Sequence, residues 1–182
     1  MKRRDVIAGL GSLGVLAGAG VVATRGSSML ESDEESGDWG NDPIELETID
    51  APGSEAGSIT VPEPGQAMVV DFFATTCTSC ASLMPTVAEA QAAVDDVTFL
   101  SVTIERDEAQ IEEWWEEYEG DWTVGMDPGI DLYERYDVVS TPTTVAIDGS
   151  GESHWRSEGS KTLEEILDGA AAASEAAAEE SQ

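Results

Sequence analysis

Residues 70–80 read VDFFATTCTSC and contain both cysteines of the chain, Cys77 and Cys80. A short apolar run over residues 68–74 has the length of a buried strand, and apolar residues at helical spacing follow the cysteines as far as Val94. The pattern therefore predicts a buried strand that ends just before the cysteine pair and a helix over residues 77–94. The two thiols are expected at the junction of these elements.

This position suits redox chemistry. Residues i and i+3 are neighbours on a helix, so the sulfurs of Cys77 and Cys80 can come close enough to form a disulfide. The unpaired N–H groups and the positive dipole end of a helix start stabilise a thiolate on Cys77, and the thiolate attacks in thiol–disulfide exchange. Cys80 lies one turn further along, where it is expected to be shielded and to resolve a mixed disulfide by attacking the sulfur of Cys77.

The cysteine pair has two alternative interpretations. As a structural bridge it would stabilise the chain by only about 2 kcal/mol, because the loop it closes is short. As half of a zinc site it would need cysteines from a second chain, since two cysteines and one histidine cannot supply four ligands. The redox hypothesis requires neither a metal nor a bound organic cofactor.

The rest of the chain alternates between strand-like and helix-like segments. Strands are expected over residues 44–48, with a partner at 59–61, and over 97–104, 143–147 and 153–158. Helices are expected over residues 107–118, 129–136 and 163–173. This order, with a hairpin and a helix at its end, predicts a three-layer α/β domain.

Several of these segments resemble the thioredoxin superfamily. Residues 70–80, followed by Met84-Pro85, resemble its active-site segment, and residues 136–144 (YDVVSTPTT) resemble its cis-proline segment. The resemblance covers residues 44–173 and implies a thioredoxin-like fold, with a central mixed β-sheet flanked by helices and an added N-terminal β-hairpin. Together with the basic N-terminus described below, it points to the TlpA-like branch of membrane-anchored or exported thiol–disulfide oxidoreductases.

The resemblance also implies roles for particular residues. Cys77 would be the nucleophile and Cys80 the resolving thiol, and the two would form the Cys77–Cys80 disulfide when oxidised. Asp71 would be a semi-buried acid whose pKa is raised by burial, which lets it exchange protons with Cys80. Pro142 would follow a cis peptide bond and face the disulfide. The backbone of Thr141 would pair with an extended substrate segment.

The sequence departs from the family pattern around the cysteines. Thr76 stands where the family usually has tryptophan, and Thr78-Ser79 between the cysteines lacks the usual proline. These three residues are expected to border the substrate, but they leave the direction of electron flow open. A reductase is favoured, and an oxidase or isomerase of the same fold is the alternative. A second alternative is a copper metallochaperone similar to the Sco type, with His154 as a further ligand.

The N-terminus is predicted to be an export signal or a membrane anchor over residues 1–26. Lys2, Arg3 and Arg4 precede an uncharged, glycine-rich apolar segment from Val6 to Ala23, which resembles a twin-arginine signal. Cleavage and retention both remain open, so the domain is expected outside the cytoplasm, either anchored or secreted. Residues 27–42 are predicted to be an acidic linker, 43–173 the folded domain, and 174–182 an acidic Ala/Glu tail.

Acidic residues dominate the composition, with 38 Asp and Glu against 8 Lys and Arg and a formal net charge of −30. Such a chain repels nucleic acid, which excludes a DNA- or RNA-binding role. The scarcity of lysine, found only at Lys2 and Lys161, resembles proteins of extreme halophiles. The expected partners are exported proteins that carry disulfides, a membrane dithiol as electron donor, and the membrane itself if the N-terminal segment is retained.

Overall fold

The computed structural model describes residues 42–180. The predicted export signal (1–26) and all but the last residue of the predicted linker (27–42) lie outside this range. Within residues 42–180, no helix is long and apolar enough to cross a membrane.

A seven-stranded mixed sheet forms the centre of the domain, in the order β2-β1-β5-β4-β3-β6-β7. The neighbours β3, β4 and β5 run parallel, and every other neighbouring pair is antiparallel. The predicted mixed sheet is confirmed, and β1 and β2 form the added N-terminal hairpin at one edge. The strands are β1 (Ile44–Thr48), β2 (Gly57–Val61), β3 (Ala67–Phe72), β4 (Val97–Thr103), β5 (Thr123–Met126), β6 (Thr143–Ile147) and β7 (Ser153–Glu158).

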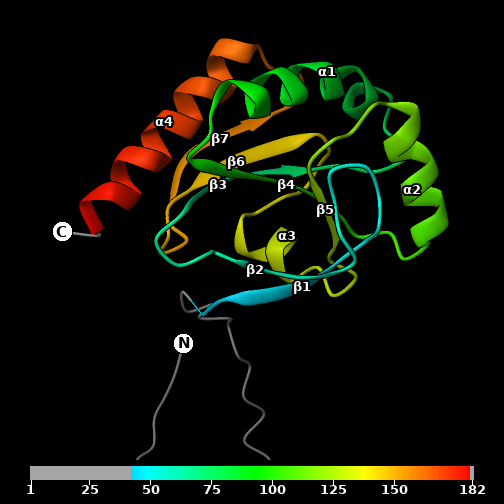
Figure 1. Ribbon diagram of the computed structural model, residues 1–182, viewed down its shortest axis with the longest axis horizontal. Helices are drawn as coiled ribbons and strands as arrows, with labels where there is room; N and C mark the ends of the chain where they lie inside the picture. The colour runs from blue at the N-terminus through cyan, green and yellow to red at the C-terminus, as the bar shows by residue number, and fades with distance from the viewer. Residues whose placement is uncertain (1–41, 181–182) are drawn as a thin grey trace, which may run out of the picture. The chain divides into compact units, whose positions relative to one another are not determined.

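Helices cover both faces of the sheet (Figure 1). One face packs against α1, α2 and α4 in a hydrophobic cluster that includes Leu83, Trp115 and Ile166. The other face packs against α3 and the segment after it, in a cluster that includes Leu132 and Tyr136. The helices are α1 (Thr78–Ala93), α2 (Glu108–Glu117), α3 (Asp131–Arg135) and α4 (Leu163–Glu180).

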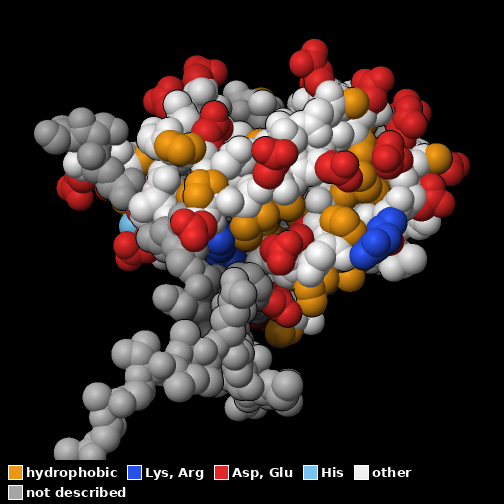
Figure 2. Space-filling view, turned by 90° about the horizontal axis from the view of Figure 1, so that it is seen from below, with side chains coloured by type: hydrophobic (Ala, Val, Ile, Leu, Met, Phe, Trp, Pro, Cys, Tyr) orange, Lys and Arg blue, Asp and Glu red, His pale blue; other side chains and the backbone are white. Residues whose placement is uncertain are grey.

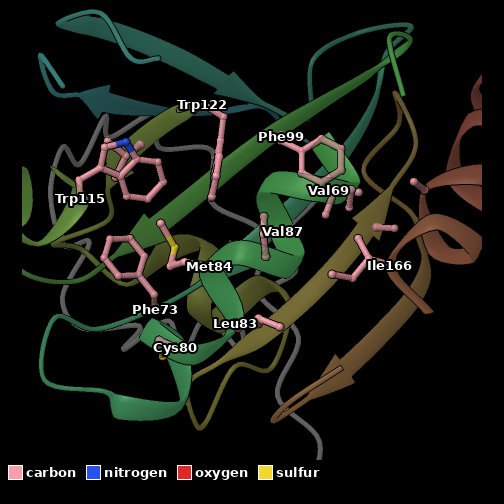
Figure 3. Close-up of a cluster of buried hydrophobic side chains, with 14 of the residues drawn as sticks. Val69, Phe73, Cys80, Leu83, Met84, Val87, Phe99, Trp115, Trp122 and Ile166 are labelled. Atoms are coloured by element: carbon pink, nitrogen blue, oxygen red, sulfur yellow. The ribbon is translucent and has the colours of Figure 1, made fainter. Parts of the chain in front are cut away.

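The central strand β3 is buried along its whole length, as its apolar sequence predicts. Side chains alternate along a strand, and here Val69 contributes to the cluster under α1 and α4 while Val70 and Phe72 contribute to the cluster under α3. This alternation turns the side chain of Asp71 toward α1 and α4. Figure 3 shows part of that cluster, with side chains of α1 lying over the sheet.

Two features differ from the sequence-based expectation. The strand β5 was not predicted, although it pairs with both β4 and β1. The last helix was predicted to end at Ala173, with residues 174–182 as a tail, but α4 continues to Glu180. Ala173 and Ala177 are both buried in the cluster under α1 and α4, so the second half of α4 is part of the core.

Candidate active site

The cysteine pair lies at the start of α1, as predicted. Cys77 is the N-cap residue, and its Sγ accepts a hydrogen bond of 3.1 Å from the backbone N–H of Cys80. The two sulfurs form a disulfide. Cys77 is half-buried, whereas Cys80 is only 2% exposed and belongs to the hydrophobic cluster under α1. A reagent from solvent can therefore reach the first sulfur far more easily than the second.

The residues around the disulfide are open to solvent. Thr76, Thr78 and Ser79 are all exposed, so these predicted substrate contacts surround the accessible sulfur. The hydroxyl of Ser79 lies 3.4 Å from Cys77 Sγ. A partner protein that approaches Cys77 would contact short polar side chains, with Thr76 in place of the tryptophan that is usual in the family.

The segment before the cysteines is fixed by residues that sequence reasoning missed. The Thr75 hydroxyl donates to Glu105 Oε1 at 2.8 Å, and its backbone N–H donates to Glu105 Oε2 at 3.1 Å. The side chain of Gln110 donates to the Thr75 hydroxyl at 2.6 Å. Glu105 follows β4, and the carboxyl ends of the parallel strands β3 and β4 meet at one edge of the sheet. Because Glu105 comes just after β4, this arrangement of parallel strands was enough to predict that Glu105 lies beside the segment between β3 and α1.

Asp71 lies inside the sheet, on the face that α1 and α4 cover. Asp71 is 3% exposed, and its Oδ1 accepts a hydrogen bond of 2.6 Å from the hydroxyl of Thr144 on β6. Burial raises the pKa of Asp71 to about 6, while the hydrogen bond from Thr144 and the charge of Lys161 lower it. A carboxyl group with this pKa can both give and take a proton near neutral pH.

The segment that precedes β6 reaches the same end of the sheet. Phe72 and Thr143 are register partners, so Pro142 lies beside the chain that leads from β3 to the cysteines. The Thr141–Pro142 peptide bond is cis. The Pro142 carbonyl oxygen accepts a hydrogen bond of 2.8 Å from the backbone N–H of Gly159, and the Thr143 hydroxyl donates to the Ser140 carbonyl at 2.7 Å.

An apolar groove of about 660 Å³ adjoins this segment, and its wall includes Thr141 and the residues Phe73 and Ala74 that follow β3. It also includes the large apolar side chains that stand out to solvent in the described domain: Ile104 (45% exposed), Ile130 (42%) and Val139 (85%). Apolar side chains gathered in this way mark interaction surfaces. The chain as a whole is strongly acidic, and Figure 2 shows acidic side chains spread across one face with apolar ones between them.

His154 does not join the cysteines. The antiparallel pairing of β6 with β7 puts Glu158 opposite Thr143 and Ser153 opposite Ile147, so His154 lies toward the opposite end of the sheet. Its ring Nε2 is 2.5 Å from Asp148 Oδ2. Within the described part of the chain, no three His, Cys, Asp or Glu side chains are grouped as metal ligands. Among residues 42–180, the ligand set of the copper hypothesis, His154 with the two cysteines, is therefore not assembled.

A mixed sheet with this strand order, with a disulfide at the start of α1 and a cis-proline segment at the same end of the sheet, defines a thiol–disulfide oxidoreductase of the thioredoxin class. The chain belongs to the Redoxin family, which it matches over residues 48–170. No curated protein sequence matches the chain.

Solved structures with the same fold are numerous. StoA from Bacillus subtilis is 20% identical, with a TM-score of 0.61 over 70% of this chain and 96% of that one. A secreted disulfide oxidoreductase from Mycobacterium tuberculosis is 21% identical, with a TM-score of 0.57 over 69% and 94%. The exposed lipoprotein thioredoxin from Streptococcus pneumoniae is 27% identical, with a TM-score of 0.57 over 70% and 96%.

Proposed function

We propose that the protein is an exported reductase that uses the Cys77–Cys80 couple to reduce disulfides in other exported proteins. The observation that carries this proposal is the unequal exposure of the two sulfurs. Cys77 is half-buried at a helix start, and Cys80 is buried on the face that also holds Asp71. An accessible attacking sulfur and a protected resolving sulfur are what a two-step exchange needs.

The reaction begins with the reduced form. The Cys77 thiolate attacks one sulfur of the client disulfide; a mixed disulfide forms and the other client sulfur leaves as a thiolate, which takes up a proton. Cys80 then attacks Cys77 Sγ, restores the Cys77–Cys80 disulfide and releases the second client thiolate. Asp71 accepts the proton that Cys80 loses in this step. The client gains two electrons, and a membrane dithiol returns two electrons to the protein by the reverse exchange.

The groove beside Thr141 is the proposed site for the client segment. Ile104, Ile130 and Val139 offer apolar contact, and the backbone of half-buried Thr141 would offer strand-like hydrogen bonds. Glu134 and Asp137 also line the groove. A client with apolar and basic residues next to its disulfide would therefore fit best. Apocytochromes and other metalloproteins that need reduced cysteines before maturation are the proposed clients.

Trapping of the mixed disulfide tests this proposal. In the Cys80→Ser variant the second step cannot occur, so clients should stay attached to Cys77 and be recovered from the exported and membrane fractions as adducts that reductant releases. The Cys77→Ser variant is the matched control and should trap none. The proposal would be wrong if Cys80→Ser trapped no protein while the wild type failed to accelerate the reduction of insulin by dithiothreitol in molar KCl.

Export is proposed from the N-terminus. A pair of arginines followed by a weak apolar segment favours the twin-arginine route, and two of the similar proteins are described as secreted or exposed. Replacing Arg3 and Arg4 with lysine keeps the charge but removes the arginine pair. The variant should stay in the cytoplasm, whereas Lys2→Arg should be exported normally. Unchanged export of the Arg3→Lys, Arg4→Lys variant would contradict the twin-arginine route.

A further inference from the structure

Ile130 has an unusual backbone conformation for its residue type. Its φ of 64° and ψ of 19° lie in the left-handed helical region, where the Cβ of a branched side chain crowds the backbone. Among residues 42–180, the other non-glycine residues with positive φ are Glu119 and Asp137, and neither is β-branched. Glycine has no Cβ and adopts this conformation without strain. Isoleucine at position 130 therefore strains the backbone where glycine would not.

Hydrogen bonds on both sides hold Ile130 in this conformation. Its N–H donates to the Asp127 carbonyl oxygen at 3.0 Å, and its carbonyl oxygen accepts a bond of 2.9 Å from the Glu134 N–H. The Asp127 carboxylate accepts the N–H groups of Asp131 and Leu132, both at 2.9 Å. The Asp127 side chain thus caps α3 directly after Ile130 and fixes where the helix begins.

The loop before Ile130 is anchored to the end of β4. The Asp127 N–H donates to the Thr103 carbonyl oxygen at 2.8 Å, and the Arg106 guanidinium donates to the Pro128 carbonyl oxygen at 2.7 Å. A strained residue persists where the surrounding structure fixes it in this way, and such residues cluster at functional sites. The conformation of Ile130 therefore raises the question of what its side chain does.

The side chain of Ile130 does not serve the hydrophobic core. Ile130 is 42% exposed and belongs to neither of the two clusters of buried side chains. The core contact of this segment is made by Leu132, which is fully buried in the cluster under α3. The stability of the fold thus gives no reason for a branched apolar residue at position 130.

Ile130 instead lines the apolar groove that adjoins the cis-proline segment. Ala74 lines it too, three residues before Cys77, and so does Thr141 at the cis peptide bond. The groove therefore lies along the chain segments that lead to the accessible sulfur and to Pro142. A client whose disulfide exchanges with Cys77 can place the residues next to its own cysteine in this groove.

We propose that Ile130 is a specificity-determining residue, held in a strained conformation so that its side chain contacts an apolar side chain next to the client's disulfide. The inference rests on the proposed function, because the contact is made while the client exchanges with Cys77. Glu134 and Asp137 add carboxylates to the same wall. The occupant of the groove is therefore an extended client segment in which an apolar side chain has a basic neighbour.

The strain is tested without any activity measurement. Thermal unfolding of the full-length oxidised protein compares alanine with glycine at two exposed positions of the groove wall, so that loss of the original side chain cancels. Ile130→Gly should have a Tm about 2 °C higher than Ile130→Ala, because glycine avoids the strain. Val139 has no positive φ and is the matched control. There glycine should be less stable than alanine, since glycine has more freedom in the unfolded chain.

The role in specificity is tested with peptides that contain one intramolecular disulfide and a lysine. Leucine or serine is placed at each position that flants a cysteine, one position at a time, and kcat/KM is measured in molar KCl. At one of these positions the wild type should prefer leucine about fivefold, the size expected for partial burial of this side chain. Ile130→Ser should reduce the preference to about twofold or less, mainly through KM. Ile130→Val, which keeps a branched apolar side chain, should retain it.

Reduction of oxidised glutathione should be the same in all these variants, because glutathione does not fill the groove. A purely structural role of Ile130 would instead slow every peptide and glutathione by the same factor. Lower stability of Ile130→Gly than of Ile130→Ala overturns the proposal, since the strain would be absent. An unchanged leucine preference in Ile130→Ser also overturns it and leaves the proposed function intact. If the wild type reduces neither the peptides nor insulin, the proposed function fails, and the role of Ile130 fails with it.

Discussion

Asp71 and Thr144 form a buried cross-strand pair, in which the Thr144 hydroxyl donates a hydrogen bond of 2.6 Å to Asp71 Oδ1. This bond stabilises the carboxylate but does not offset the cost of burial, so the pKa of Asp71 rises from 3.8 to about 6. The active-site end of the sheet thus contains an acid that is costly for the fold. Such a group persists when the chemistry of the site needs it.

The first prediction concerns stability and pH. The folded-state pKa of Asp71 lies above its value in the unfolded chain, so folding favours the protonated carboxyl group. The stabilisation of the fold by this proton is complete below pH 3.8 and is lost as the pH rises through 6. A shift of this size corresponds to about 3 kcal/mol. Asp71→Asn should therefore be more stable relative to the wild type at pH 8 than at pH 4, as measured by urea unfolding of the oxidised proteins. A constant difference between the two proteins across this range would contradict the burial of a titrating Asp71.

The second prediction concerns the two thiols after reduction. Cys77 is half-buried at a helix N-terminus and Cys80 is buried, so iodoacetamide should modify Cys77 at least tenfold faster at pH 7. Peptide mapping by mass spectrometry after short reaction times measures the ratio. Equal modification rates of Cys77 and Cys80 in the folded protein would contradict their assignment as the attacking and the resolving thiol. The same measurement in urea is the control, and there the rates should converge.

The third prediction concerns the groove. Val139→Ser and Ile104→Ser remove exposed apolar surface from its wall and should raise KM for a protein disulfide several-fold, because an apolar contact of this size is worth about 1 kcal/mol. Reduction of a small disulfide such as oxidised glutathione should be unaffected, since it does not fill the groove. Ala92→Ser, on the exposed side of α1, is the control. An equal loss with both substrates would point to damage at the cysteines instead.

The fourth prediction concerns salt. With a formal net charge of −30, the folded chain repels itself strongly, and 1 M salt reduces the screening length to about 3 Å. The free energy of unfolding should rise steeply between 0.1 and 2 M KCl, as measured by thermal unfolding at pH 7. A series of uncharged sucrose solutions separates screening from general exclusion effects. Stability that does not change with KCl would contradict the halophilic interpretation.

Much of the site followed from local sequence patterns. The start of α1 at the cysteines was predictable because a continuous apolar run precedes them and helical spacing follows. The apolar run over residues 68–74 predicted the buried strand that carries Asp71, and the resemblance implied that Asp71 is a semi-buried acid. The two elements were predicted from patterns within a few residues, without knowledge of the tertiary structure.

The features that were missed depend on contacts between distant segments. The strand β5 is short and contains Gly125, so its sequence has little strand character; its neighbours β4 and β1 define it. Residues 170–180 are almost all alanine and glutamate, and their hydropathy pattern does not reveal that Ala173 and Ala177 face the core. Lysine is seldom buried, so nothing local indicated that Lys161 turns inward.

The reduction potential of the Cys77–Cys80 couple tests the central claim most directly. The full-length protein would be equilibrated with defined dithiol buffers in molar KCl, and its free thiols counted by mass after alkylation. A reductase should have a potential close to that of thioredoxin, about −270 mV, with fast exchange. A potential near that of a strong oxidant, about −120 mV, would contradict the account and make the protein a donor of disulfides to newly exported proteins.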